Sequence, residues 1–176
     1  MAIDETKVFK PINIAVLTVS DTRTPETDTS GEILAGRVTG AGHTLAARMI
    51  VRDDAPSLAA QFEAWIDDPA VDAVVSTGGT GLTGRDVTPE ALAMIAGARA
   101  IPGFGELFRW LSYKSIGTST VQSRAMAVVA RGTYIFALPG SNGAVKDGWD
   151  GILAEQLDSR NRPCNFVDLM PRLREI

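Results

Sequence analysis

A glycine-rich segment, TGGTG at residues 77–81, follows an apolar run and leads through Arg85 and Asp86 to a helix start at TPEA. Glycine lets backbone N–H groups approach an anion without a side-chain clash, and a helix N-terminus adds a partial positive charge. Such a segment is typical of a loop that binds nucleotide phosphates. It has neither the Gly-Lys-Ser/Thr of a P-loop nor the Gly-x-Gly-x-x-Gly of a dinucleotide fold, so the residues alone name no reaction.

Polar residues also follow the other apolar runs. They are Ser20 and Asp21, then Asp53 and Asp54, and later the segment PGS at 139–141. The carboxyl ends of parallel strands meet at one edge of a sheet, so we expect these residues to converge on the glycine loop. Carboxylates gathered at an anion site repel one another unless they hold a hard cation such as Mg²⁺. The sequence therefore predicts an anion or nucleotide site at this edge, at which a hard cation such as Mg²⁺ would make the carboxylates tolerable.

Each of these residues also has a purely structural interpretation. TGGTG could be only a tight turn from strand to helix, and Ser20 with Asp21 could start a turn. Asp53 and Asp54 could form a solvated lead-in to a helix. Asp86 could favour the following helix N-terminus or pair with Arg85. Spacing alone leaves these alternatives open.

Composition excludes several classes of protein. The 176 residues suit one domain, residues 1–176, and the net charge of −4 argues against a nucleic-acid binder. The first residues are acidic and form neither a signal peptide nor a membrane span, and we expect a frayed arm or an oligomer contact there. Cys164 is the single cysteine, which fits a cytoplasmic protein and suggests neither zinc binding nor a nucleophile. His43, the single histidine, is expected to be structural.

Apolar β-branched runs alternate with helical patterns along the chain. This alternation predicts a three-layer αβα fold of the α/β class, with a mostly parallel sheet covered on both faces. The expected strands are 13–19, 43–51 and 71–76, followed by a hairpin of 121–130 and 133–138 whose first strand is antiparallel. The expected helices are 32–39, 57–67, one capped by Thr88, 106–115 and 145–157, with an irregular arginine-rich tail from Asp158.

With these residues in view, the chain resembles the molybdopterin adenylyltransferase family of molybdenum cofactor biosynthesis, the MogA/MoaB group. The resemblance covers nearly the whole chain, through LTVSDTR, DTSG, AGH, IVRDD, TGGTGLTGRDVTPEA, PGFGELFRWLSYKSIGTSTVQSRA, IFALPGS and RNRPCNF. The segments LFRWLSY and RPCNF favour the MoaB branch. The resemblance implies the same fold, assembled as a homotrimer or homohexamer. It also implies transfer of AMP from Mg-ATP to the terminal phosphate of molybdopterin, with release of pyrophosphate.

The resemblance also implies roles for individual residues. Catalysis and Mg²⁺ binding fall to Asp53 and Asp86. The residues implied to bind the nucleotide and its phosphates are Thr77, Gly78, Gly79, Thr80, Gly81, Gly103 and Glu106. The residues implied to bind the pterin are Ser20, Asp21, Ser123, Arg124, Pro139, Gly140 and Ser141. Where the family often has proline after LPGS, this chain has Asn142 and Gly143, which we expect to loosen the turn.

Hypotheses from different classes remain at this point. The retained Arg85, Asp86 and Asp53 favour an enzyme. A non-catalytic molybdopterin-binding scaffold, in contact with other proteins of the pathway, is the alternative. A nucleotide or pyrophosphate hydrolase is a third. The apolar helix that contains Phe108, Trp110, Leu111 and Tyr113 is expected to meet either a partner or the core, and the family resemblance implies an oligomer contact.

Overall fold

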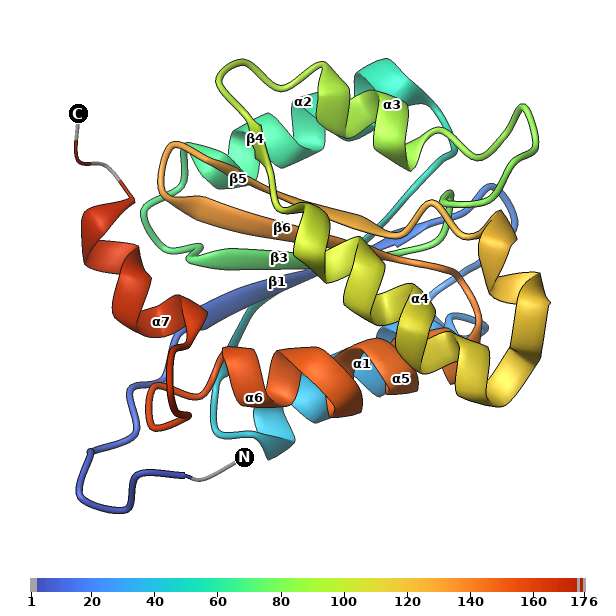
Figure 1. Ribbon diagram of the computed structural model, residues 1–176. Coiled ribbons are helices and arrows are strands. Elements are labelled where there is room, and N and C mark those ends of the chain that lie inside the picture. The colour runs from blue at the N-terminus through green and yellow to red at the C-terminus, as the bar shows by residue number, and fades with distance from the viewer. Residues whose placement is uncertain (1–2, 174, 176) are drawn as a thin grey trace.

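The computed structural model describes residues 3–173 and 175. Within them, six strands form one sheet in the order β2-β1-β3-β6-β5-β4, with helices on both faces (Figure 1). The strands are β1 (Asn13–Val19), β2 (Thr44–Val51), β3 (Ala73–Thr77), β4 (Arg99–Ala100), β5 (Met126–Ala130) and β6 (Thr133–Leu138). Four of them, β2, β1, β3 and β6, run parallel, while β5 is antiparallel to both of its neighbours. The predicted α/β class and its antiparallel exception are confirmed.

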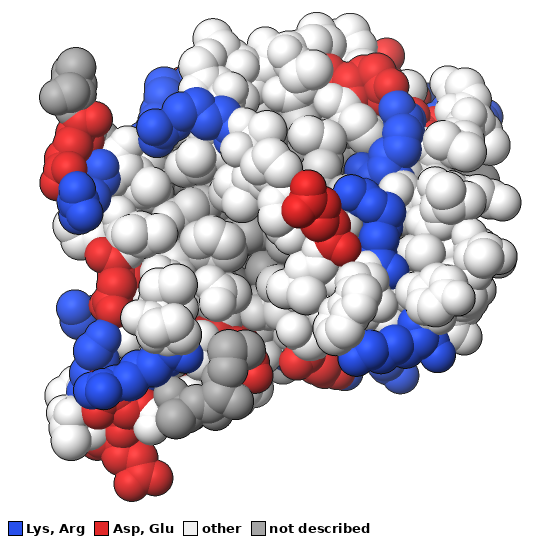
Figure 2. Space-filling view, in the orientation of Figure 1, with Lys and Arg blue, Asp and Glu red and all other residues white. Residues whose placement is uncertain are grey.

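The helices form the two outer layers. They are α1 (Thr29–Gly40), α2 (Ala55–Ile66), α3 (Thr88–Ala93), α4 (Pro102–Ile116), α5 (Asn142–Gly148), α6 (Ala154–Gln156) and α7 (Phe166–Leu169). Two 3₁₀ segments, Gly117–Gln122 and Met170–Arg172, and a π-helical segment, Trp149–Leu153, complete them. Among the described residues, no helix is long and apolar enough to cross a membrane. Figure 2 shows charged groups of both signs around a broad uncharged area on one face.

The central strand β1 explains why the sheet is covered twice. Ile14 and Val16 belong to the core beneath α1, α4 and α5, whereas Ala15 and Leu17 belong to the core beneath α2 and α3. All four are fully buried, as alternate residues of a strand must be when helices lie on both faces. The apolar run that predicted the strand is therefore a consequence of two cores meeting on it.

The strand order places a crevice beside the end of β1. The chain passes from β1 to β2 on one side and returns to β3 on the other side. Loops that leave neighbouring strands in opposite directions open a crevice at the carboxyl edge of a parallel sheet. The backbone joins the loops there: Gly78 N donates to Leu138 O at 2.9 Å, and Ser20 N donates to Val51 O at 2.9 Å. The predicted convergence of the loops is confirmed.

Several helix boundaries differ from the sequence-based predictions. α1 begins at Thr29, earlier than expected, because the Asp28 carboxylate caps it by accepting a hydrogen bond from Gly31 N at 2.9 Å. α4 begins at Pro102, which suits the first turn of a helix. The prediction that Thr88 caps α3 is wrong, because its hydroxyl donates to Gly78 O at 2.9 Å instead.

The second half of the chain has more irregular structure than its pattern predicted. The strand expected at 121–130 is shortened to β5, since a 3₁₀ segment precedes it. The helix expected at 145–157 begins at Asn142 and contains the π-helical segment, and the tail expected to be irregular contains α7. The expected loosening of the turn by Asn142 and Gly143 stays a prediction, and the turn is held by two hydrogen bonds. Ser141 caps α5 by accepting from Ala144 N at 3.1 Å, and Asn142 Oδ1 accepts from the Thr29 hydroxyl at 3.0 Å.

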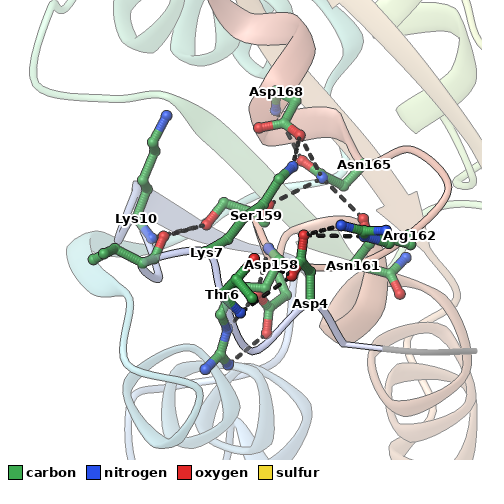
Figure 3. A network of polar contacts seen from close by, with 12 residues as sticks. Asp4, Thr6, Lys7, Lys10, Asp158, Ser159, Asn161, Arg162, Asn165 and Asp168 are labelled. Atoms are coloured by element: carbon green, nitrogen blue, oxygen red, sulfur yellow. Dashed lines mark hydrogen bonds and ion pairs between the residues drawn. The ribbon is translucent and has the colours of Figure 1, made fainter.

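The N-terminal arm was expected to be frayed or to form an oligomer contact. Its described residues lie instead on the C-terminal tail (Figure 3). Ile3 forms a β-bridge with Asn161, and Asp4 N donates to Arg160 O at 2.9 Å. The Asp4 carboxylate accepts hydrogen bonds from the Thr6 hydroxyl and from the guanidinium of Arg162. These two groups lower the pKa of Asp4 from 3.8 to about 2. The arm is thus fixed by contacts that span almost the whole sequence.

We expect Asp4→Asn to lower the melting temperature at pH 7, because the ionised carboxylate is held by Thr6 and Arg162. A carboxylate whose pKa is depressed by folding contributes stability above its unfolded-state value, and the contribution is lost as the pH falls through the folded-state value. The difference in melting temperature between wild type and variant should therefore shrink from about pH 4 to about pH 2. Thermal unfolding across this range measures it. Glu5→Gln, at an exposed neighbour, is the control, and an equal effect of both substitutions would contradict the assignment.

Candidate functional site

The glycine loop packs tightly against the end of β1. Gly78 and Gly79 have φ values of +105° and +65°, which side chains rarely adopt. A Cβ atom on Gly78 would lie 2.3 Å from Val19 O, and one on Gly79 would lie 2.4 Å from Thr88 Oγ1. Glycine is therefore required here for packing. The number of glycines alone does not separate a tight turn from an anion site, so the case for a site depends on what surrounds the loop.

The segment 139–141 supports the loop from the β6 side. Thr77 Oγ1 donates to Pro139 O at 3.1 Å. A Cβ atom on Gly140 would lie 3.3 Å from Gly78 Cα, so the two glycine turns touch. Small residues at both positions let the two backbones meet at the carboxyl edge of β3 and β6.

Two carboxylates lie against the glycine loop. A Cβ atom on Gly79 would be 3.5 Å from Asp53 Oδ1, and one on Gly81 would be 2.8 Å from Asp86 Oδ2. Burial, and then the negative charge of Asp86, raise the pKa of Asp53 above its ordinary value. Burial opposes ionisation of Asp86 as well, but hydrogen bonds from the hydroxyl and amide of Thr83 hold the pKa of Asp86 below its ordinary value. The loop thus brings together two like charges that repel each other.

The neighbouring charged residues have other partners. Asp54 caps α2 by accepting from Ser57 N at 3.0 Å, so the structural interpretation of the acidic pair holds for Asp54. Arg85 forms an ion pair with Asp21 and not with Asp86. Asp53 is therefore the member of its pair that faces the glycine loop, as the family resemblance implies.

The arrangement suits a magnesium ion that a substrate helps to bind. Among the described residues, no group of three or more His, Cys, Asp or Glu side chains could hold a metal. Mg²⁺, however, commonly takes one or two carboxylates and completes its octahedron with water and substrate phosphates. A divalent cation would also offset the repulsion between Asp53 and Asp86 that raises the pKa of Asp53. The residues present therefore fit this ion.

Next to the end of β1 lies a hollow of about 650 Å³, which we call the basic pocket. It is lined by Ser20, Asp21, Arg23, Thr24, Pro25, Arg48, Met49, Ile50 and Arg52. Arg48 is held by Asp28 and Glu32, and Arg23 donates to Thr27 O at 3.0 Å. The Arg52 guanidinium makes no hydrogen bond or ion pair within the described part of the chain. The pocket therefore presents cationic side chains suited to an anion.

A smaller hollow of about 230 Å³, the loop pocket, lies over the glycine loop. It is lined by Thr18, Val19, Ser20, Arg23, Ser30, Thr77, Gly78, Gly79 and Gly140. Ser20 and Arg23 line the basic pocket too, so the two hollows are neighbours. Together they offer backbone groups of the glycine turns beside arginine side chains.

A third hollow of about 360 Å³, the hydroxyl pocket, lies on the α4 side of the loop. Its hydroxyl groups come from Thr80, Ser112, Ser115, Ser119, Thr120, Ser123 and Ser141. Its other lining residues are Gly81, Phe108, Ile116, Gln122, Pro139, Gly143, Ala144 and Asp147. The combination of apolar walls with many hydroxyls suits a flat polar ligand, and the volume is that of a small-molecule site.

Arg124 holds the glycine loop from the β5 side. Its Nε donates to Gly81 O at 2.7 Å, and its remaining guanidinium nitrogens bond Asp86 O and the Glu90 carboxylate. Its amide N also donates to Thr80 O at 2.8 Å. Contact between Arg124 and a pterin stays a prediction, and its role in the structure is to position the loop.

Not every residue expected at the site is brought to it. Ser20, Asp21, Ser123, Pro139, Gly140 and Ser141 line the hollows with the loop residues 77–81, as the previous paragraphs describe. Gly103 and Glu106 lie in the first turns of α4 and line none of the three hollows. In the same segment, a Cβ atom on Gly105 would lie 2.4 Å from Ala125 O, so Gly105 lets α4 approach the backbone there.

Sequence reasoning missed several lining residues. Arg23 and Arg52 lie close in sequence to Asp21 and Asp53, and their positive charge beside these carboxylates was an available signal. The hydroxyls of the hydroxyl pocket come mainly from α4 and the 3₁₀ segment. The serine and threonine content of 112–123 could have indicated them, but nothing local told which side they face.

The comparisons with known proteins give one consistent result. The sequence profile described as "Probable molybdopterin binding domain" matches residues 15–159. Molybdenum cofactor biosynthesis protein B of Escherichia coli strain K12 is 51% identical over 158 residues, covering 90% of this chain and 92% of that protein. The protein of the same name from Bacillus subtilis strain 168 is 42% identical over 160 residues, covering 89% and 94%.

The fold gives the same answer. A crystal structure of a molybdenum cofactor biosynthesis protein B superposes with a TM-score of 0.85 at 36% sequence identity. The superposition covers 97% of this chain and 100% of that one. The described fold and the sequence similarity therefore agree over nearly the full length.

We expect substitutions of the two carboxylates to change stability in opposite directions in metal-free buffer at pH 7. Asp53→Asn removes a charge whose ionisation is opposed by burial and by Asp86, so the melting temperature should rise slightly, on the order of 1–2 °C. Asp86→Asn weakens the hydrogen bonds from Thr83 and should lower it. Added Mg²⁺ should stabilise the wild type more than either variant.

Thermal unfolding with and without Mg²⁺ measures these effects. Asp54→Asn is the matched control, because asparagine caps a helix as well as aspartate does and the loop is not involved. A lowered melting temperature for metal-free Asp53→Asn would contradict the electrostatic assignment.

Proposed function

The chain belongs to the family of the probable molybdopterin binding domain and acts in molybdenum cofactor biosynthesis, and on this premise we propose that it transfers AMP from Mg-ATP to molybdopterin. One observation carries the proposal. Two separate hollows meet at a glycine loop that has two carboxylates against it. A transferase needs two substrate sites with the reacting phosphates between them, whereas a hydrolase needs only one.

The nucleotide fits the basic and loop pockets. Phosphate oxygens in the loop pocket would face the backbone of Gly78 and Gly79, where no side chain intervenes. Arg23 and Arg52 supply positive charge beside them. Asp53 and Asp86 would hold Mg²⁺, which when bound neutralises developing charge on the phosphates.

The pterin fits the hydroxyl pocket. Phe108, Ile116 and Pro139 give apolar surface for a flat ring system, and the serine and threonine hydroxyls can meet its polar edges. Asp147 adds a carboxylate at the same wall. The pocket reaches the loop at Thr80 and Gly81, so a phosphate on this ligand would lie beside the nucleotide phosphates.

The reaction needs no covalent intermediate with the protein. An oxygen of the pterin phosphate attacks the α-phosphorus of ATP, the new P–O bond forms, and the bond to the bridging oxygen breaks so that pyrophosphate leaves. The attacking oxygen of a phosphate is already ionised near neutral pH and requires no strong base. The work of the chain is to position both phosphates and offset their charge. Arg124 serves this by fixing the backbone at Gly81 and Asp86.

An adenylylation assay tests the proposal. Purified protein, freshly prepared molybdopterin, ATP and Mg²⁺ should yield adenylylated pterin and pyrophosphate in equal amounts, followed by chromatography. Asp86→Asn and Asp53→Asn should each lower kcat/KM by roughly 100- to 1,000-fold, the range for loss of one electrostatic group at a reaction centre. Asp54→Asn is the control and should retain activity, because this carboxylate caps α2.

The two alternatives give different results in the same assay. Pterin binding without product would mean a non-catalytic scaffold. Pyrophosphate released from ATP without pterin would mean a hydrolase.

We further propose that copies of the chain associate through the exposed apolar face of α4 and the following 3₁₀ segment. Trp110, Tyr113, Ile116 and Val121 are each more than half exposed. Ile116 also lines the hydroxyl pocket, so a second copy on this face would close the mouth of the pocket to water. The face lies next to the proposed pterin site, which couples assembly to binding.

Trp110→Lys should convert an oligomer to monomers, because it places a charge in an apolar contact. Analytical ultracentrifugation of wild type and variant measures the change. Val8→Lys is the control, since Val8 is also an exposed apolar residue but lies on the N-terminal arm. A wild type that sediments as a monomer would overturn the proposal.

A further inference from the structure

Thr80, in the glycine loop, has a buried hydroxyl without a partner. The residue is 2% exposed, and Thr80 Oγ1 is one of the few buried side-chain polar atoms in the described residues without a hydrogen bond. Burying a hydroxyl that makes no hydrogen bond costs free energy, so such groups are uncommon in folded proteins. Because the residue Thr80 lines the hydroxyl pocket, a bound ligand is a candidate partner for its unpaired hydroxyl.

Four of the surrounding hydroxyls, from Thr77, Thr88, Thr120 and Ser115, bond within the protein. The two other threonines that anchor the loop, Thr77 and Thr88, donate to Pro139 O and Gly78 O. In the hydroxyl pocket, Thr120 Oγ1 donates to Arg109 O at 3.3 Å, and Ser115 Oγ donates to Ser112 O at 3.0 Å. Thr80 differs from its neighbours on both sides. Among the described residues, Thr80 Oγ1 is the hydroxyl oxygen that is both buried and without a partner.

The position of Thr80 decides which substrate its hydroxyl meets. Residues 77–79 of the loop line the loop pocket, whereas Thr80 and Gly81 line the hydroxyl pocket. The chain thus crosses from one hollow to the other between Gly79 and Thr80. Arg124 N fixes the crossing by donating to Thr80 O at 2.8 Å. The hydroxyl belongs to the side on which the acceptor would bind.

We propose that Thr80 Oγ1 donates a hydrogen bond to the phosphate of the pterin and not to the nucleotide. This inference rests on the proposed function and assigns one residue of the loop to the acceptor. Ionised phosphate oxygens only accept hydrogen bonds, so a hydroxyl donor is suited to them. Thr80 is then a positioning contact that holds the attacking phosphate at the end of the glycine loop.

Binding to Thr80→Val tests the proposal without requiring turnover. Valine keeps the shape and removes the hydroxyl. Affinities for molybdopterin and for its dephosphorylated form are measured by titration in the absence of ATP, with Thr39→Val, on α1 and outside the three hollows, as the control. Thr80→Val should weaken binding of the phosphorylated pterin by about 10- to 100-fold, the effect of losing one hydrogen bond to a charged group. It should leave binding of the dephosphorylated pterin and of Mg-ATP unchanged.

Stability provides an independent readout. Thr80→Val removes an unpaired buried hydroxyl, so its melting temperature should not fall below that of the wild type. Thr120→Val breaks a hydrogen bond and leaves Arg109 O without that donor, so its melting temperature should fall. A correctly folded Thr80→Val protein ensures that any loss of binding comes from the hydroxyl.

Three results would overturn the inference. Equal weakening for both pterin forms, or none, would mean that the hydroxyl does not meet the phosphate. Weakened Mg-ATP binding alone would place the hydroxyl on the nucleotide side. Wild-type protein that binds no pterin would remove the acceptor altogether. By contrast, phosphate-specific weakening in a protein that forms no product would support this inference while overturning the proposed transferase activity.

Discussion

The contact between the glycine loop and the end of β1 is the constraint on which the site depends. Gly78 lies so close to Val19 O that any side chain would collide with it. This approach requires positive φ values at two consecutive residues, which glycine alone adopts at little cost. Because the loop lies so close to the end of β1, Asp53 from the β2 side and Asp86 from the α3 side can both reach it. Replacing either glycine would move the carboxylates along with the backbone.

The same contact divides the charges of the site into two groups. Hydrogen bonds from Thr83 stabilise the ionised form of Asp86. The ionised form of Asp53 is disfavoured by burial and by the charge of Asp86, which raise its pKa. Of the nearby arginines, Arg85 is paired with Asp21, and Arg124 is bound to loop carbonyls and Glu90. The charge of Arg124 helps to lower the pKa of Asp86, but the pKa of Asp53 stays raised. The folded protein therefore keeps an excess of negative charge beside the loop, and positive charge in the basic pocket. A substrate that brings both a cation and phosphates offsets both.

The fold could be predicted from the sequence because apolar runs reflect burial on two faces, as in β1 and β3. The convergence of Asp53, Asp86 and the glycine loop followed from the rule for parallel strands. Other features depend on contacts between distant segments, which periodicity does not contain. The role of Thr88 is fixed by Gly78 O, the break before β5 by the 3₁₀ segment, and the hydroxyl pocket by which side of α4 faces the loop. β4, with two residues, is too short to leave a pattern.

The arm and tail described in Figure 3 also bear on the order in which the chain folds. The bridge between Ile3 and Asn161 joins the first described residue to one near the end of the sequence. When the ribosome has synthesised the last strand of the sheet, β6, the tail residues that contact the arm have not yet been made. The arm therefore cannot contact the tail until the residues after β6 have been synthesised. Closing so long a loop is favourable only once the intervening structure has brought its ends together. The arm–tail contact can thus form only late in synthesis, after all the strands of the sheet have been made.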